Sequence, residues 1–98
     1  MKNIYFGDFR KHVSGYISEL NKNNYAIDSI EWFLLKYLRR IIKAIDVEAD
    51  NAPGRVEGSM RSLMRFYVDN IDEKSEFGDR CMKIYEQYRK TLRHSQIE

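Results

Sequence analysis

The most regular pattern of hydrophobic and polar positions lies in residues 27–47. Apolar residues recur there at intervals of three and four, which is the spacing along one face of an α-helix. That face comprises Ile27, Ile30, Leu34, Leu35, Tyr37, Leu38, Ile41, Ile42, Ala44 and Ile45. Because it covers more than half of the helix circumference, it predicts a central helix with packing neighbours on two or three sides.

The first residues of this segment carry signals for a helix start. Asp28 and Glu31 have the spacing of a capping box, in which each carboxylate accepts a hydrogen bond from a backbone N–H group that lacks a helical partner. Ile27 before the cap and Trp32 inside the helix are spaced to form a hydrophobic staple. We therefore expect Asp28 to cap the helix and Ile27 to pack on it.

Three other segments have the helical period with a narrower apolar face. They cover residues 6–20, residues 53 or 55 to 71, and residues 72 or 75 to 93. The NKNN sequence at 21–24 and the stretch 51–54, which holds the only proline, predict the first two connections. Short connections favour an antiparallel arrangement. The pattern predicts an all-α fold, an antiparallel four-helix bundle forming a single domain over residues 1–98, in which the central helix contacts the other three helices.

One aromatic residue of the third segment does not fit its apolar face. Phe66 lies roughly 110 degrees from the centre of that face when residues are placed 100 degrees apart. A residue in this position either reaches a further side of the core or is exposed to solvent. An exposed aromatic side chain is a candidate contact with a protein partner.

Composition narrows the class of protein. Apolar residues make up 43% of the chain and charged residues 33%, which is typical of a folded globular domain. The net charge of +2 is too small to predict nucleic acid as the main partner.

Cys81 is the only cysteine, so an internal disulfide is excluded and a reducing cytoplasm is expected. No apolar run is long enough for a secretory signal or a membrane span, so we expect no membrane partner.

Catalytic patterns are missing from the sequence. His12 and His94 lie off the apolar faces, and neither belongs to a Glu-x-x-His motif or to another arrangement of metal ligands. Cys81 lies within an apolar face, where unreactive cysteines are common. We therefore expect no catalytic residue, no metal and no cofactor, and a binding protein rather than an enzyme.

Two charged groups of residues are candidate binding surfaces. The basic strip, opposite the apolar face of residues 27–47, comprises Lys36, Arg39, Arg40 and Lys43, with Trp32 at its upstream end. Cations beside an aromatic ring are suited to binding phosphates and stacked bases. The solvent-exposed face of an ordinary core helix carries the same residue types. The acids Asp46, Glu48 and Asp50 argue against a duplex lying along the whole helix.

The acidic cluster surrounds the predicted start of the last helix. It comprises Asp69, Asp72, Glu73, Glu76 and Asp79. Carboxylates are common at helix N-termini because the helix dipole stabilises them there, so part of the cluster has a local explanation. Five acids in eleven residues also favour a basic protein partner, since opposed potentials speed encounter and orient docking.

The segment Arg89-Lys-Thr-Leu-Arg-His94 separates an arginine and a histidine by four residues. This spacing resembles the signature of HEPN ribonucleases, which are helical bundles, and the resemblance implies that Arg89 and His94 act on an RNA phosphodiester. Lys90 stands where that family has an Asn-type residue. The alternative is a solvated helix end whose cations interact favourably with the helix dipole.

In size, predicted helicity and lack of catalytic motifs, the whole chain resembles the small all-helical immunity proteins of colicin and contact-dependent growth inhibition systems. The resemblance implies a cytoplasmic bacterial inhibitor that neutralises a toxin by direct docking. The slightly basic net charge differs from the acidic character of many nuclease inhibitors. On this hypothesis the acidic cluster and Phe66 are the contacts with the toxin domain. Small residues on the third helix, at Gly58, Ser59 and Ser62, leave a homodimer open as well.

Overall fold

A computed structural model describes residues 6–47 and 52–96 of the chain, and the side chains of residues 6–46 and 54–93. The described residues form four helices and no strand, so the predicted all-helical fold is confirmed. The helices are α1 (Gly7–Leu20), α2 (Ile30–Val47), α3 (Ala52–Asn70) and α4 (Glu76–Gln96). The radius of gyration of 13.4 Å is that of a single compact domain of this length.

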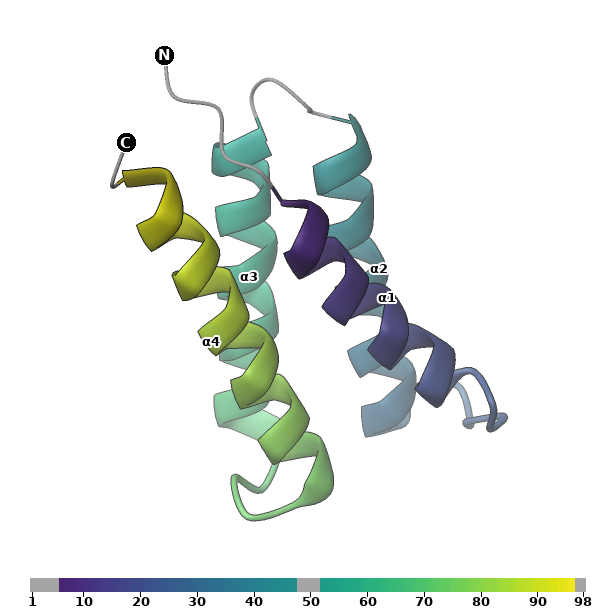
Figure 1. Cartoon of the computed structure of the whole chain (residues 1–98). Helices are drawn as coiled ribbons and strands as arrows, with labels where there is room; N and C mark the ends of the chain where they lie inside the picture. The colour runs from purple at the N-terminus through teal and green to yellow at the C-terminus, as the bar shows by residue number, and fades with distance from the viewer. Residues whose placement is uncertain (1–5, 48–51, 97–98) are drawn as a thin grey trace.

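Successive helices run in alternating directions along the molecule (Figure 1). α1 packs on α2 and α4, and α3 packs on the same two helices from the other side. Across the described residues, no pair of Cα atoms within 8 Å joins α2 to α4, so these two helices lie diagonally opposite each other. The prediction that α2 contacts all three other helices is therefore wrong. Its wide apolar face is shared between two neighbours, α1 and α3.

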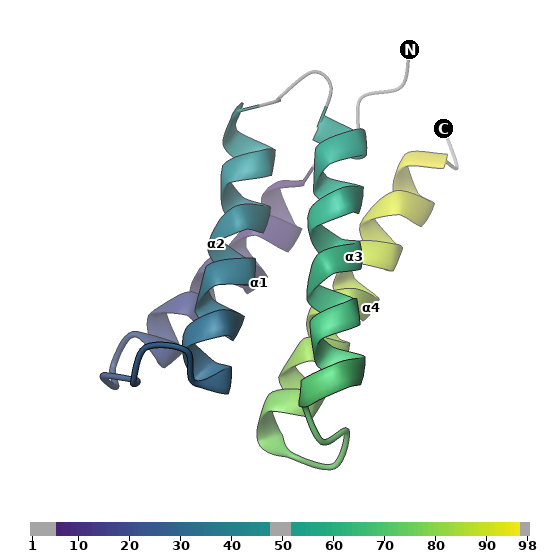
Figure 2. The same cartoon turned by 180° about the vertical axis from the view of Figure 1, so that it is seen from behind.

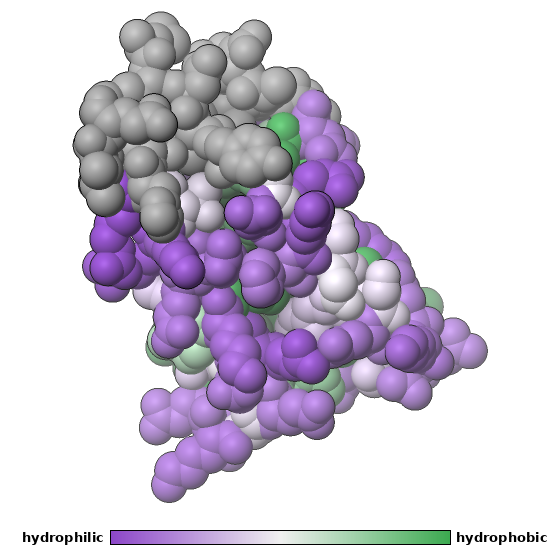
Figure 3. Space-filling model, in the orientation of Figure 1, coloured by the Kyte–Doolittle hydropathy of each residue, from purple (hydrophilic) through white to green (hydrophobic). Residues whose placement is uncertain are grey.

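The core is built from residues of all four helices. In α2 the side chains of Leu34, Leu38 and Ile41 are completely buried, as the apolar period predicted. The other fully buried side chains of the described part are Phe9, Val13, Val56, Met60, Leu63 and Cys81. The face formed by α1 and α4 is mostly hydrophilic on its outside (Figure 3).

The start of α2 differs from the expectation. Ser29, and not Asp28, is the capping residue, because its Oγ accepts a hydrogen bond from the Trp32 N–H group at 3.2 Å. Asp28 lies one residue earlier with a φ of 68°, a left-handed conformation that aspartate tolerates better than most residues. Ile27 is 77% exposed, so the predicted hydrophobic staple is wrong too. The chain turns sharply at Asp28, and this turn removes Ile27 from the helix.

Phe66 is a second correction. Only 9% of its surface is exposed, and its ring lies 5.9 Å from the ring of Phe33 and 5.2 Å from that of Tyr37, measured between centroids. These aromatic residues of α2 cover the side of α3 that carries Phe66. The interpretation of Phe66 as an exposed contact is therefore wrong, because its side chain belongs to the interface between α2 and α3.

Candidate functional site

The structure places the acidic cluster around the connection between α3 and α4. Asp69 lies in the last turn of α3, Asp72 and Glu73 lie in the connection, and Glu76 and Asp79 lie in the first turn of α4. All five side chains are exposed. The connection lies at the same end of the molecule as the one between α1 and α2 (Figure 1).

Hydrogen bonds hold this connection against the start of α4. The Ser75 hydroxyl donates to the Asp72 carbonyl at 2.6 Å and accepts a hydrogen bond from the Gly78 N–H group at 3.0 Å. The Asp72 carboxylate in turn accepts a hydrogen bond from the Lys74 N–H group at 3.0 Å. Ser75 is thus the capping residue of α4, one of the two starts that the sequence left open.

Gly78 allows the connection to pack closely on α4. A Cβ atom at this position would lie 2.9 Å from the Glu73 Cα and carbonyl oxygen, and closer still to the carbonyl oxygen of Asp72. These contacts are with backbone atoms, which cannot rotate away. The absence of a side chain at Gly78 therefore determines where Asp72 and Glu73 lie. Sequence reasoning missed this role because it depends on a contact between two elements.

Most of the acidic cluster is not neutralised by other described residues. Asp79 pairs with Lys83 at 3.1 Å, as the i,i+4 spacing predicts. Arg80 does not pair with Glu76, which has the same spacing, but with Glu19 of α1 at 2.9 Å. Among the described residues, Asp79 is the only member of the cluster in an ion pair. The cluster therefore presents an exposed negative charge at a defined position.

The basic strip lies along the outer side of α2, and its four side chains are exposed. The Lys36 ammonium lies 5.7 Å from the centre of the Trp32 ring, and the Arg40 guanidinium lies 5.7 Å from that of Tyr37. Arg39 donates a hydrogen bond to the Asn21 side chain at 3.0 Å. In the parts of the chain that the structure describes, none of the four cations has an acidic partner.

Asp46, which follows the basic strip in α2, has a different partner. The Arg10 guanidinium of α1 donates two hydrogen bonds to its carboxylate, at 2.8 and 2.9 Å. The hydrogen bond from Arg10 lowers the pKa of Asp46, and the same bond raises the pKa of Arg10. Asp46 is thus neutralised by α1. Of the three acids expected to oppose the basic strip, Glu48 and Asp50 lie outside the described residues.

Two adjoining hollows accompany the basic strip, on the side where α2 and α3 lie next to each other (Figure 2). The first, of about 380 Å³, lies along α2 between Trp32 and Lys43. The second, of about 390 Å³, lies between α2 and α3 and is lined on the α3 side by Arg55 and by the small residues Gly58, Ser59 and Ser62. Arg40 and Lys43 line both hollows, so the two form a continuous basic surface.

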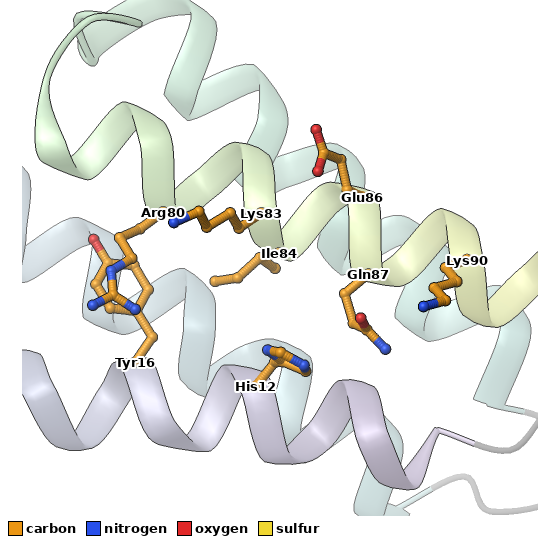
Figure 4. Close-up of a pocket in the computed structure, with 8 residues that line it drawn as sticks. All are labelled: His12, Tyr16, Arg80, Lys83, Ile84, Glu86, Gln87 and Lys90. Atoms are coloured by element: carbon orange, nitrogen blue, oxygen red, sulfur yellow. The ribbon is translucent and has the colours of Figure 1, made fainter.

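A third hollow, of about 430 Å³, lies between α1 and α4 (Figure 4). His12 projects into it from α1, and Ile84 and Gln87 project into it from α4, whereas Glu86 points away from α1. Of the arginine and lysine residues that line it, Arg80, Lys83 and Lys90, the first two are paired with acids. Sequence reasoning missed this groove because its two walls are far apart in the chain.

Two titratable groups next to this groove are buried. The Tyr16 hydroxyl has no hydrogen-bond partner among the described residues, and burial raises its pKa. The Arg80 guanidinium lies 5.7 Å from the centre of the Tyr16 ring. Burial also raises the pKa of the Cys81 thiol to about 12, so this cysteine stays protonated at neutral pH. A protonated, completely buried thiol is a poor nucleophile, in agreement with the prediction.

The two residues of the HEPN-like spacing both belong to α4. Arg89 is exposed, and its guanidinium lies 5.9 Å from the centre of the Tyr85 ring. The side chain of His94 lies outside the described residues. The structure therefore describes only the Arg89 side of an Arg89–His94 pair.

Among the described side chains, no three histidine, cysteine, aspartate or glutamate residues are grouped so that they could hold a metal ion. None of the described helices has the length and apolar character needed to cross a membrane. No protein-family model matches the chain, and no curated protein and no solved structure matches it either.

Proposed function

We propose that this protein is a cytoplasmic, non-enzymatic inhibitor that binds a toxin domain, in the manner of the bacterial immunity proteins that it resembles in size and helicity. In this proposal an antiparallel four-helix bundle docks its acidic cluster on a basic surface of the toxin. The observation that carries the proposal is the exposure of five carboxylates around the connection between α3 and α4, whose backbone is held against the start of α4.

The way the connection is held favours binding. Ordering a loop when a complex forms costs free energy, which reduces the affinity. Here Ser75 bonds the connection to the start of α4, and Gly78 lets the two pack in contact. The backbone that carries Asp72 and Glu73 is therefore positioned before a partner arrives, and little ordering of the connection remains.

The charge of the cluster favours a basic partner. Complementary potentials accelerate encounter and orient the two proteins, and both effects weaken as salt is added. Screening acts over about 8 Å at physiological ionic strength, so neighbouring carboxylates act together on an approaching cation. Many toxin domains that act on nucleic acid would present such a basic surface, because their substrate is a polyanion.

The test is co-expression with the product of the reading frame next to this gene, taken as the toxin. The wild-type chain should relieve the toxicity and co-purify as a stoichiometric complex. Reversal of Asp72, Glu73 and Glu76 to lysine should weaken binding by about tenfold or more, and the loss should be greatest at low salt. Isothermal titration calorimetry at two salt concentrations measures both effects.

A matched control reverses three acids outside the cluster, Asp8, Glu31 and Glu86, and so changes the net charge equally. This variant should keep its affinity within about threefold, because rim charges far from a contact act only through the weak long-range field. Equal losses in both variants would contradict docking by the acidic cluster. A neighbouring product that neither binds the chain nor loses toxicity in its presence would contradict the inhibitor proposal.

A further inference from the structure

We infer that the basic strip, together with Trp32 and the hollow between α2 and α3, binds single-stranded nucleic acid. Phosphates would contact the four cations, and a base would stack on the Trp32 ring. This activity goes beyond the proposed inhibition of a protein and uses a different surface, so either can fail without the other.

The first support is an imbalance of charge on α2. The ion pairs of the described residues use Arg10, Arg61, Arg80 and Lys83 as their cations, and none uses a member of the basic strip. The acid that follows the strip in the described chain, Asp46, has both carboxylate oxygens bonded to Arg10. Four exposed cations thus lie within about 10 Å along one helix without a counter-ion among the described residues. Such a group is satisfied by a polyanion that releases its own counter-ions on binding.

The second support is the shape of the surface. The hollow between α2 and α3 has Arg40 and Lys43 on its α2 side, and its α3 side carries small residues next to Arg55. A Cβ atom added to Gly58 would have no neighbour within 4 Å, so the floor of this hollow is open. A sugar-phosphate backbone can therefore approach α3 closely while it contacts Arg40 and Lys43.

The third support is the position of Trp32, which distinguishes nucleic acid from other polyanions. Its ring packs edge-on against Phe33, with the centroids 5.0 Å apart and the planes at 84°. The same ring borders the hollow that Lys36, Arg39 and Arg40 line. An indole held in this way next to several cations is typical of surfaces on which an unpaired base stacks. A base in a duplex is already stacked, so the arrangement favours a single strand.

Trp32 is the only tryptophan and therefore reports on its own site. The full chain is titrated with a thymidine oligonucleotide of about twelve nucleotides, and tryptophan fluorescence is recorded. Binding should quench the fluorescence. Three or four phosphate contacts predict a slope of about −2 to −3 for log K against log salt, which is a loss of about 16- to 64-fold in affinity between about 50 and 200 mM salt.

Two variants of equal net charge locate the site. Replacing Arg39, Arg40 and Lys43 by glutamine should reduce the affinity by at least tenfold and flatten the salt slope by about 2. Replacing Lys22, Lys74 and Lys90 by glutamine should change neither by more than about threefold. Because all six replaced side chains are exposed and glutamine is a good helix former where the position is helical, both variants should fold, and circular dichroism checks this. Gly58→Glu adds an acid to the open hollow and should also weaken binding.

Two results would overturn the binding of single-stranded nucleic acid by the basic strip. They are equal losses in the two triple variants and a lack of quenching by the oligonucleotide at low salt. Heparin and polyglutamate serve as polyanions without bases, and binding them as tightly as the oligonucleotide would show a surface for acidic polymers or proteins instead. Stronger binding of a duplex than of the single strand would overturn the role of Trp32. The acidic-cluster variant Asp72→Lys, Glu73→Lys, Glu76→Lys should retain binding, which keeps this result separate from the proposed inhibitor function.

Discussion

Gly78 is a residue whose importance comes from a contact and not from its local conformation. It lies inside α4, where alanine would normally stabilise the helix by about 1 kcal/mol. Its missing side chain instead makes room for the backbone of Asp72 and Glu73. Residues of this kind connect the stability of the protein to the shape of its acidic cluster.

Gly78→Ala should therefore lower the free energy of unfolding by about 1–2 kcal/mol, because the strain of overpacking exceeds the gain in helix propensity. For a domain of this size the midpoint of thermal unfolding should fall by roughly 5–10 °C. Gly15→Ala is the matched control, since a Cβ atom there has no neighbour within 4 Å. The control should stabilise by about 0.5–1 kcal/mol. Stabilisation of both variants would contradict the close contact at Gly78.

Tyr16, in contrast to Gly78, has a group that lowers the stability of the fold. Its hydroxyl is buried without a hydrogen-bond partner among the described residues. A polar group in this state costs about 1–3 kcal/mol of desolvation. Tyr16→Phe removes the hydroxyl and keeps the ring contact with Arg80, so the free energy of unfolding should rise by about 1 kcal/mol. Urea denaturation measures the change. A loss of stability of similar size would mean that the hydroxyl has a partner in solution.

At the scale of elements, α1 and α2 are joined by the Arg10–Asp46 pair. The pKa of Asp46 is lowered by its hydrogen bond to Arg10, so the folded state holds the carboxylate proton less tightly than the unfolded state. The stabilisation from the pair is complete above the ordinary pKa of aspartate, about 4, and is lost as the pH falls through the lower pKa of the folded state.

Arg10→Gln should accordingly reduce stability at neutral pH and leave stability unchanged at the acid end of the range. Thermal unfolding followed from about pH 7 to about pH 2 tests this, with Arg61→Gln as a control that breaks an exposed pair within one helix. The difference between wild type and Arg10→Gln should shrink as the pH falls. A constant difference would place the effect in packing and not in the charge of Asp46.

The ends of the elements show the limit of local patterns. The predicted helix at residues 6–20 differs by one residue from α1, and the predicted start at residue 53 differs by one from that of α3. α2 begins two residues after the proposed cap, Asp28. The sequence did not distinguish Asp28 from Ser29, because aspartate and serine are both common capping residues. Only the path of the preceding chain, through the left-handed Asp28, decides between them.

At the scale of the whole molecule, opposite charges lie on separate elements. The acidic cluster surrounds the connection between α3 and α4, and the basic strip lies along α2. The small residues of α3 lie in the same hollow as Arg40 and Lys43. A homodimer through this face would bring the cations of two copies together, and this disfavours self-association there. The arrangement instead suits two different partners.

The sequence by itself determined the four helices, most of the residues that line their buried faces and the exposure of both charged groups. These features follow from the helical period, which is a local property of a few neighbouring residues. Tertiary structure alone decided that Phe66 is buried and that the connection between α3 and α4 packs against Gly78. It also decided that Arg10 pairs with Asp46, and Arg80 with Glu19, across helices. Each of these contacts depends on the distance and angle between helices, which no local period encodes.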